Sequence, residues 1–338
     1  MARHRIDKQA RDILIGLCCY GQSKSEAKRQ IEAIRAKEHN IRAKEKAEFG
    51  EPRTLLTPKA PPGIYSFSTF NNYLYHCTRF VNWAKQEHGC KTVEQAKPFI
   101  KEYIQETMYS DYSASTIKSI HAAVAKLYGL STELGAKDSI AMNTPERKRE
   151  DITRSRGQAE RDKHFNPEKP KNKEFVEFCK ATGLRRSEVL AITAGQIIAY
   201  KDIPQFRKDE GKIAKSPTNQ YIIIHKNQGK GGRVRYVPIL TKSAVDLMKG
   251  KPTHEKVWPI PQGQKSIFTK ADIHSFRRDY ATTLYNLYAK PIDQISENQK
   301  YKCRGNLAGV VYDKESMRNT SEALGHSRIC VIAGHYLH

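Results

Sequence analysis

The chain has 338 residues, which predicts two or three domains, and it carries 59 lysines and arginines against 36 acidic residues. The formal net charge of +23 points to a polyanionic partner, nucleic acid first, and is large for a protein that is basic only for solubility. The seven cysteines are odd in number and include no Cys-x-x-Cys pair, which indicates reduced thiols in a cytosolic protein rather than a disulfide framework or a zinc site.

Residues 1–60 are basic, and their pattern predicts helices. The apolar run at residues 13–20 is too short to cross a membrane and no cleavage site follows it cleanly, so we expect neither a transmembrane segment nor a secretion signal. Residues 23–48 then form either a solvated helix with a thin apolar stripe or an appendage that contacts DNA. The stripe consists of Ala27, Ile31, Ile34 and Ile41.

A proline-rich stretch at residues 51–63 indicates a linker. The pattern of residues 64–130 predicts a small all-helical domain. Ser68 and Thr69 are expected to cap its first helix, and the last helix is expected to end at Gly129. The first helix has one apolar face, made by Phe70, Tyr73, Leu74, Cys77, Val81 and Ala84. Its domain also carries four cations that either meet phosphates or are simply solvated: Arg79, Lys85, Lys101 and Lys118.

Residues 131–172 are rich in both charge signs and close with prolines, which predicts an interdomain linker. Residues 173–338 then predict a mixed, mainly helical domain with a small antiparallel sheet. Its expected strands, 219–226 and 233–240, are joined by a glycine-containing turn. Its expected helices cover 173–183, 185–198, 242–249, 271–289 and the region around 315–332.

Four stretches of this last domain carry residues suited to phosphate chemistry. His274 and Arg277 lie three residues apart, so a helix would place both on one face, with Phe276, Tyr280 and Leu287 available to anchor the other. An isolated His-x-x-Arg pair is more often part of a solvated amphipathic helix. A functional role for the pair is favoured because the other three stretches supply an arginine, a lysine, a histidine and a tyrosine, which phosphate chemistry also requires.

Arg185 and Arg186 follow a glycine at the start of an expected helix, where the helix dipole disfavours positive charge. A bound phosphate would resolve this conflict, since helix N-termini and arginine both bind phosphate oxygens. Alternatively, both arginines point into water. Glu188, three residues after Arg185, is placed to hold its guanidinium.

Lys230 lies between two turn glycines, where a mobile tip can deliver a proton donor, although a basic loop that touches backbone phosphates is the more common case. His326 follows a glycine after a helical segment. Tyr336 is the only tyrosine in the final stretch, and its hydroxyl is a competent nucleophile at phosphorus. Alternatively, Tyr336 is a terminal aromatic residue that packs on the core.

Together, the ordered set TGLRRSE, GKGGRVR-VP, HSFR and LGHSRI…Y resembles the catalytic domain of the tyrosine recombinase (phage integrase) family. The match covers residues 173–338, and residues 64–130 resemble the core-binding domain of that family more loosely. By the same resemblance, residues 1–60 form an arm-type or accessory region that contacts DNA or another subunit. The segment between the last two motifs resembles integrases of mobile and integrative elements.

The resemblance also implies a role for each candidate residue. Arg185 and Arg277 would bind the non-bridging oxygens of the scissile phosphate, with Glu188 as the supporting carboxylate. Lys230 would protonate the departing 5′-oxygen. The histidines would assist, His274 in proton transfer and His326 by a hydrogen bond to the phosphate. Tyr336 would form the 3′-phosphotyrosyl link.

Two features depart from the family pattern. Tyr336 lies ten residues after His326, whereas nine is the usual spacing and places His335 at the position of the nucleophile. Gly334 is expected to absorb the extra residue by loosening the end of the helix. Only two residues follow Tyr336, whereas many members carry a C-terminal segment that docks onto a neighbouring subunit, so the mode of assembly stays open.

The sequence therefore predicts a site-specific integrase that cuts and rejoins double-stranded DNA as a homotetramer on two paired sites. We expect no metal or ATP, because cationic side chains neutralise the phosphate and the protein–DNA link conserves the bond energy. Accessory DNA-bending or directionality factors and a prokaryotic cytoplasmic, nucleoid-associated location are expected too. The alternatives are a type IB topoisomerase-like enzyme and a catalytically inactive basic DNA-binding protein.

Overall fold

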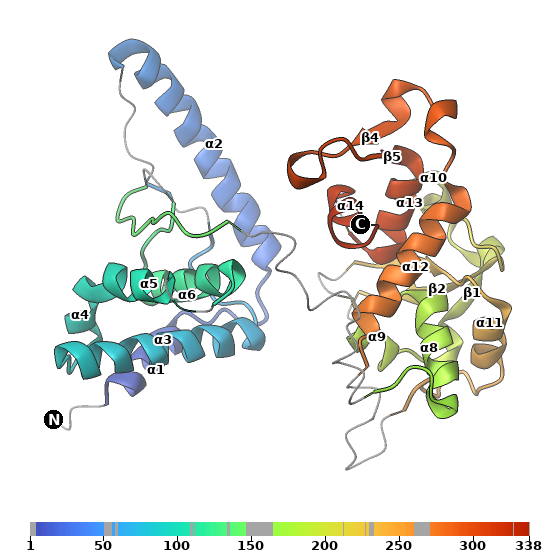
Figure 1. The fold of residues 1–338 in the computed structure, drawn as a ribbon, viewed down its shortest axis with the longest axis horizontal. Helices are drawn as coiled ribbons and strands as arrows, with labels where there is room; N and C mark the ends of the chain where they lie inside the picture. The colour runs from blue at the N-terminus through green and yellow to red at the C-terminus, as the bar shows by residue number, and fades with distance from the viewer. Residues whose placement is uncertain are drawn as a thin grey trace. The chain divides into compact units, whose positions relative to one another are not determined.

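The computed structural model describes residues 5–50, 56–57, 60–108, 110, 112–133, 136–146, 165–211, 213–226, 228–229, 233–259, 271–326 and 328–337. The chain forms two compact units, residues 1–151 and 152–338, and each is described by itself. The fold is mainly helical with small antiparallel sheets, which confirms the predicted fold class (Figure 1).

The first unit is built from helices, and the predicted first and last helices of the 64–130 domain are present. The predicted cap of the first of them is wrong. Ser66, not Ser68, is the N-cap, and its side chain accepts a hydrogen bond from the Thr69 N–H at 3.2 Å. The helices are α1 (Ile6–Gly16), α2 (Lys24–Phe49), α3 (Phe67–His88), α4 (Val93–Ala96), α5 (Ile100–Met108) and α6 (Ala114–Leu127), with a 3₁₀ turn at Lys97–Phe99.

The core of this unit forms where α3 packs between α1 and α6. Part of residues 1–60 belongs to this core, because Ala10 and Leu14 of α1 are fully buried. Cys77, Val81 and Ala84 of α3 are fully buried as expected, and the remaining predicted apolar residues of α3 pack against the same core. The apolar spacing read from the sequence therefore locates the buried face of α3.

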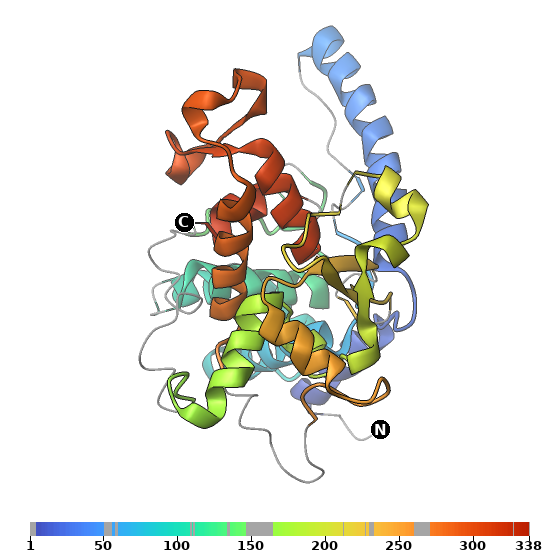
Figure 2. The ribbon, with the colours of Figure 1, turned by 90° about the vertical axis from the view of Figure 1, so that its right-hand side faces the viewer.

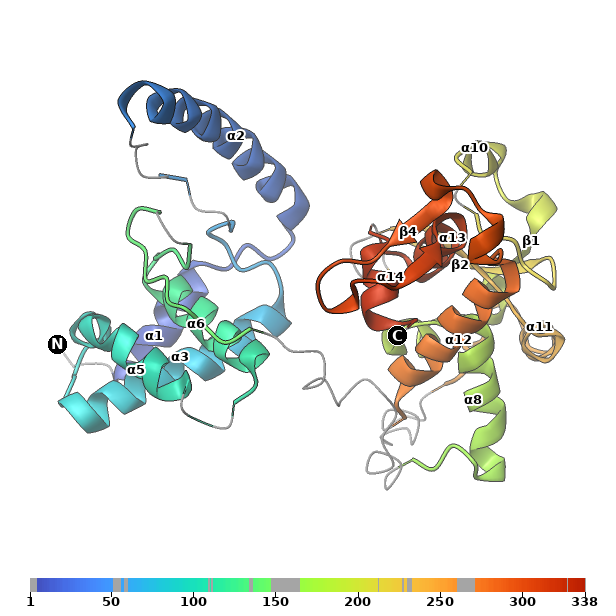
Figure 3. The same cartoon turned by 45° about the horizontal axis from the view of Figure 1, so that its top comes forward.

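Helix α2 extends beyond the other helices of its unit (Figures 1 and 3). Two residues of its predicted apolar stripe are not packed, since Ile34 and Ile41 are 51% and 43% exposed, whereas Ala27 and Ile31 are partly buried. The buried residue of α2 is Arg35, which donates to the Thr57 carbonyl at 2.7 Å and to a Glu133 carboxylate oxygen at 2.8 Å. Glu38 of the same helix accepts from the Thr57 N–H at 3.1 Å and from the Thr57 hydroxyl at 2.7 Å. Polar contacts of Arg35 and Glu38 thus attach this helix to the rest of the unit.

Part of the predicted linker 131–172 is folded. Ile140 is buried in the first core, and its carbonyl accepts a hydrogen bond from His121 Nε2 at 2.8 Å. At the other end, the first helix of the second unit begins at Pro170. Residues 147–164 of the predicted linker lie outside the described residues.

The second unit contains a three-stranded antiparallel sheet in the order β1-β2-β3. The two predicted strands pair as expected, with Ile222 opposite Val237, and β1 adds a third strand that the sequence did not predict. The strands are β1 (Ile197–Ala199), β2 (Gln220–Ile224) and β3 (Arg235–Pro238). The α-helices are α8 (Pro170–Thr182), α9 (Arg186–Val189), α10 (Gln205–Asp209), α11 (Lys242–Lys249), α12 (Ile273–Tyr288), α13 (Lys314–Leu324) and α14 (Cys330–His335).

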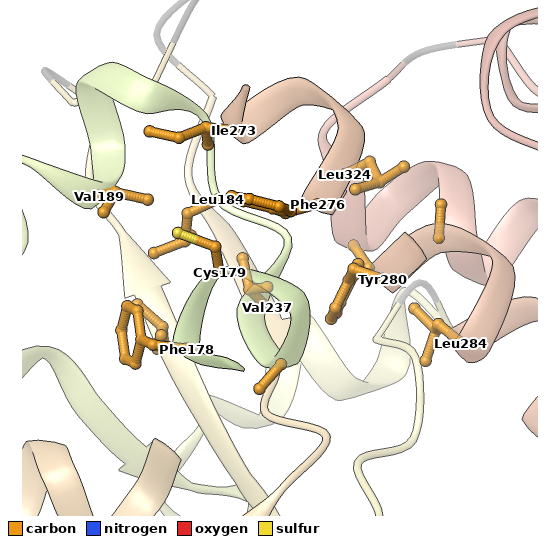
Figure 4. Packing of buried hydrophobic residues seen from close by; sticks show 14 of the residues in the cluster. Phe178, Cys179, Leu184, Val189, Val237, Ile273, Phe276, Tyr280, Leu284 and Leu324 are labelled. Atoms are coloured by element: carbon orange, nitrogen blue, oxygen red, sulfur yellow. The ribbon is translucent and has the colours of Figure 1, made fainter. Parts of the chain in front are cut away.

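A hydrophobic core joins α8, α12 and β3 (Figure 4). Phe178 and Cys179 of α8, Val237 of β3, and Tyr280 and Leu284 of α12 are all buried in it. The Tyr280 hydroxyl donates to the Pro238 carbonyl at 2.9 Å, so its polar group is satisfied inside the core. This packing fixes α12 against the sheet.

Two helix predictions in this unit are wrong. The stretch 185–198 has α-helical structure only at 186–189, because Thr193 and Gln196 form a capping box on a separate 3₁₀ turn that leads into β1. The region around 315–332 is two helices rather than one. Gly325 ends α13 in the left-handed region at φ 68°, a conformation that glycine adopts without strain.

A second hairpin, β4 (Lys300–Lys302) and β5 (Val311–Asp313), was also not predicted. It lies at the opposite end of the unit from α8 (Figures 1 and 2). Within the described ranges, no helix combines the length and apolarity needed to cross a membrane.

Candidate active site

Helix α12 carries Arg277, which lines a pocket, and the helix is held by an N-cap and by buried side chains. Asp272 is its N-cap and accepts a hydrogen bond from the Ser275 N–H at 3.4 Å. Phe276 and Tyr280 are buried and anchor the helix as predicted, but Leu287 is 48% exposed and does not. Helical geometry places His274 in the same pocket, one turn before Arg277.

Helix α9 is only one turn long, and it holds Arg185 through Glu188. The Arg185 backbone N–H donates to Glu188 Oε2 at 2.7 Å, and its Nη1 donates to Glu188 Oε1 at 2.9 Å. The Arg185 Nη2 donates to the Leu324 carbonyl at 3.0 Å. Glu188 therefore contacts Arg185 as the sequence predicted. Arg186 instead donates to the Ala271 carbonyl at 2.7 Å.

His326 lies just after Gly325, where the chain leaves α13. Its N–H donates to the Ser321 carbonyl at 2.8 Å, and its own carbonyl accepts from Ser321 Oγ at 3.2 Å. Arg233, next to strand β3, donates to the same His326 carbonyl at 3.2 Å. The His326 backbone is thus fixed from two directions.

Tyr336 follows α14 and enters the pocket. Gly334 lies inside α14, the helix ends at His335, and Tyr336 leaves it with φ −124° and ψ −41°. Tyr336 is 4% exposed, whereas His335, which has the family spacing, is exposed. The extra residue is therefore accommodated where α14 ends.

The Tyr336 hydroxyl lies within hydrogen-bond distance of two other candidate residues. It accepts a hydrogen bond from Arg277 Nε at 3.3 Å and lies 3.2 Å from His326 Nε2. Its ring centroid lies 5.6 Å from that of His274 and 5.5 Å from that of His326. Arg185 lines the same cavity of about 620 Å³.

Arg277 is the most deeply buried charge of this pocket, at 1% exposure. Besides the Tyr336 hydroxyl, its guanidinium donates to the Gly183 and Leu324 carbonyls. Burial lowers the pKa of Arg277 to about 10, with the charge of Arg185 acting in the same direction. Arg277 still carries its charge at neutral pH.

Both histidines of the pocket are neutral at neutral pH. Burial, and then the positive charge of Arg277, lowers the pKa of His326 to about 4. The same two causes lower the pKa of His274. A neutral imidazole keeps one nitrogen lone pair, so His326 Nε2 can accept a proton from the Tyr336 hydroxyl 3.2 Å away.

Sequence reasoning missed Arg235, which forms a buried ion pair with Glu188. Its Nη1 and Nη2 donate to the two Glu188 oxygens at 2.8 and 2.6 Å. Burial alone raises the pKa of Glu188, but the hydrogen bonds and charges of Arg235 and Arg185 outweigh burial and hold the pKa at about 2. The signal was present in the sequence, because a charged residue inside the apolar run of β3 is unusual unless it is paired.

Lys230, the predicted proton donor, lies outside the described residues. Its described neighbour Gly229 lies beside the buried ion pair, since a Cβ at Gly229 would lie 3.6 Å from Arg235 Nη1. Among the described residues, no three His, Cys, Asp or Glu side chains are grouped as metal ligands.

The described walls of the pocket are cationic. Arg185, Arg186 and Arg277 line it, against one carboxylate, Asp272. Glu188 is fully buried beneath and shared by two arginines. Such a site favours a ligand with at least one negative charge, and arginine forks suit phosphate oxygens.

No family model matches the chain, and no curated protein matches it significantly. Among solved structures, the chain matches that of the Tn1549 transposon integrase (aa 82–397) in complex with circular intermediate DNA. The match covers 89% of this chain and 95% of that chain, with 13% sequence identity and a TM-score of 0.36. At this identity, the chemistry of the pocket, rather than the likeness, is the basis for assigning a function.

Proposed function

We propose that the protein is a DNA strand transferase of the tyrosine recombinase type, with Tyr336 as its nucleophile. The observation that carries this proposal is the placement of the Tyr336 hydroxyl within hydrogen-bond distance of Arg277 Nε and His326 Nε2, in a cationic pocket. A tyrosine that only packs on the core has no need of a charged donor and a neutral imidazole at its hydroxyl.

In the cleavage step, the Tyr336 oxygen attacks the scissile phosphorus as its proton passes to His326 Nε2, which lies 3.2 Å from the hydroxyl. This role for His326 differs from the hydrogen bond to the phosphate that the resemblance implied. The bond from phosphorus to the 5′-oxygen breaks, and that oxygen leaves as a 5′-hydroxyl after taking a proton from Lys230. Arg185 and Arg277 neutralise the charge that develops on the non-bridging oxygens, and His274 assists proton transfer. Donors placed before the reaction give the largest share of such catalysis.

The reverse of these steps rejoins the strand, because the phosphotyrosyl bond conserves the energy of the broken phosphodiester. The reaction therefore needs neither ATP nor a metal ion, since arginines supply the positive charge. We further propose that four copies act on two paired DNA sites to integrate or excise a mobile element in the cytoplasm, with accessory factors setting direction. The net charge of +23 supports a long DNA contact.

A plasmid assay separates this function from its two alternatives. Supercoiled plasmids with one or two copies of the element junction are incubated with the protein, with Tyr336→Phe as the control. Recombination predicts strand exchange only when two sites are present. Relaxation of the one-site plasmid without exchange would identify a topoisomerase-like enzyme. Tight binding with neither product would identify an inactive DNA-binding protein and overturn the proposal.

A further inference from the structure

Arg235 lies on strand β3, outside the pocket, and is 6% exposed. Its guanidinium makes three hydrogen bonds to fixed acceptors. Two go to the carboxylate of Glu188, at 2.8 and 2.6 Å, and the third goes from Nε to the Ala323 carbonyl at 3.1 Å. This side chain joins the sheet to both α9 and the end of α13.

Arg235 binds one acceptor of Arg185 directly and the backbone next to the other. Glu188 accepts from Arg185 and Arg235 on the same two oxygens, so its four hydrogen bonds fix its rotamer. The second acceptor of Arg185 is the Leu324 carbonyl, and the preceding carbonyl, that of Ala323, is bound by Arg235. Removing Arg235 would take two of the four hydrogen bonds from Glu188 and release the Ala323 carbonyl, while the Leu324 carbonyl would keep its bond from Arg277.

The packing around Arg235 leaves little room for another arrangement. A Cβ at Gly325 would lie 3.0 Å from Arg235 Cδ, so the side chain runs directly beneath the residue that precedes His326. The turn that leads to Lys230 is also close, since a Cβ at Gly229 would lie 3.6 Å from Arg235 Nη1. The described parts of three candidate motifs therefore meet around one guanidinium.

We infer that Arg235 is a positioning residue, which holds the guanidinium of Arg185 in the orientation that receives the scissile phosphate. It acts through Glu188 and the Ala323–Leu324 backbone and touches no reacting atom. The link to catalysis rests on the proposed function, whereas the link from Arg235 to Arg185 does not. Lysine cannot replace it, because one ammonium group cannot reach two carboxylate oxygens and a carbonyl with the geometry of the arginine fork.

The test compares Arg235→Lys, which keeps the charge, with the wild type in single-turnover cleavage of a nicked DNA substrate. A displaced Arg185 is expected to slow the cleavage rate constant by about 10²-fold, as a misplacement of about 1 Å does in other sites. The half-saturating DNA concentration and the fraction of protein that reacts should stay unchanged. A role in folding alone gives the opposite result, a smaller reacting fraction that cleaves at the normal rate, and would overturn the inference.

Arg207→Lys is the matched control. Arg207 makes an ion pair with Glu210 at 3.3 Å on the surface of the same unit, away from the pocket, so its replacement should leave the rate constant unchanged. The double variant Glu188→Gln with Arg235→Met removes the buried charges together. This double variant should be more stable than Glu188→Gln alone but should cleave DNA no faster. Recovery of the cleavage rate constant along with stability would also overturn the inference.

A second readout needs neither DNA nor catalysis. In protein labelled with ¹⁵N-arginine, the guanidinium signals of Arg185, assigned by their loss in Arg185→Lys, should be protected from exchange with water. They should lose that protection in Arg235→Lys, while the signals of Arg277 keep theirs through the Gly183 and Tyr336 contacts. Unchanged Arg185 signals would overturn the inference. If the wild type cleaves no DNA while these signals respond, the proposed function fails and the positioning role stands.

Discussion

Gly183 offers a quantitative test of how the pocket is built. It ends α8 with φ 56°, and its carbonyl accepts a hydrogen bond from Arg277. A Cβ at this position would lie 2.2 Å from Cδ1 of Tyr280, a fully buried ring on α12. Gly183→Ala should therefore move α12, and Arg277 with it, as well as destabilise the second unit.

The expected size follows from two terms. A left-handed conformation costs an alanine about 1 to 2 kcal/mol, and overpacking a rigid core costs about 1 to 3 kcal/mol more. The sum of about 2 to 5 kcal/mol would lower the melting temperature of a unit of this size by roughly 4 to 20 °C. Because Arg277 shifts, DNA cleavage should slow as well.

Gly305→Ala is the matched control, because Gly305 has φ 63° in the same unit and nothing lies within 4 Å of its added Cβ. This variant carries the backbone term alone. Urea denaturation of both variants should show Gly183→Ala less stable than Gly305→Ala by about 1 to 3 kcal/mol. Equal stabilities would refute the packing of Gly183 on Tyr280 and, with it, the reasoning that positions Arg277.

Four further outcomes are expected. Tyr336→Phe should bind DNA as the wild type does but form no covalent adduct on a denaturing gel. The control Tyr200→Phe, on the exposed surface, should form the adduct normally. An adduct with Tyr336→Phe would mean that another residue attacks. Arg277→Lys should slow single-turnover cleavage by about 10²-fold or more, because an ammonium group cannot donate to all three partners, and an unchanged rate would remove Arg277 from the site. By NMR titration of the free protein, His326 should take its proton near pH 4 rather than 6.5, and a midpoint at 6.5 would contradict its burial beside arginines. Glu188→Gln should lower the free energy of unfolding of the second unit by about 3–5 kcal/mol in urea at pH 7. This deficit should shrink between pH 4.5 and 2, because the wild type keeps the stability from ionised Glu188 above the unfolded pKa and loses it as the pH falls through a folded pKa of about 2. A deficit independent of pH would contradict the ion pair.

The sequence predicted the elements whose local signals agree with the tertiary packing. The apolar spacing of α3 gave its buried face, and glycines gave the ends of α6 and α8. The strands β2 and β3 were predicted because their apolar runs flank a turn with glycines. In each case, the residues that set the local structure are also the ones that the core selects.

The failures have physical causes. The stretch 185–198 was expected to be one helix, but contacts distant in sequence decide its structure, including the pairing of Ile197 with Ile222. Ile34 and Ile41 of the apolar stripe on α2 mark no packed face, and the helix is attached through the polar contacts of Arg35 and Glu38 instead. Leu287 fits a helical pattern but lies on a part of α12 where the described residues leave it 48% exposed.

For the candidate site too, the sequence predicted some residues and missed others. Arg185, His274, Arg277, His326 and Tyr336, which the sequence motifs singled out, line one pocket. The sequence did not reveal the buried support beneath them. The charge of Arg235 within the apolar run of β3 signals a paired arginine, but its partner Glu188 lies 47 positions away, and no local pattern identifies that partner.

The most direct test of the central claim is to trap the protein–DNA intermediate and map its attachment site. The protein is incubated, without metal or ATP, with junction DNA nicked so that the cleaved fragment diffuses away, and the adduct is digested and analysed by mass spectrometry. We predict a 3′-phosphate linked to Tyr336 and a free 5′-hydroxyl on the released fragment. An adduct on another residue, or DNA bound tightly on several junctions with no adduct, would contradict the assignment of Tyr336 as the nucleophile.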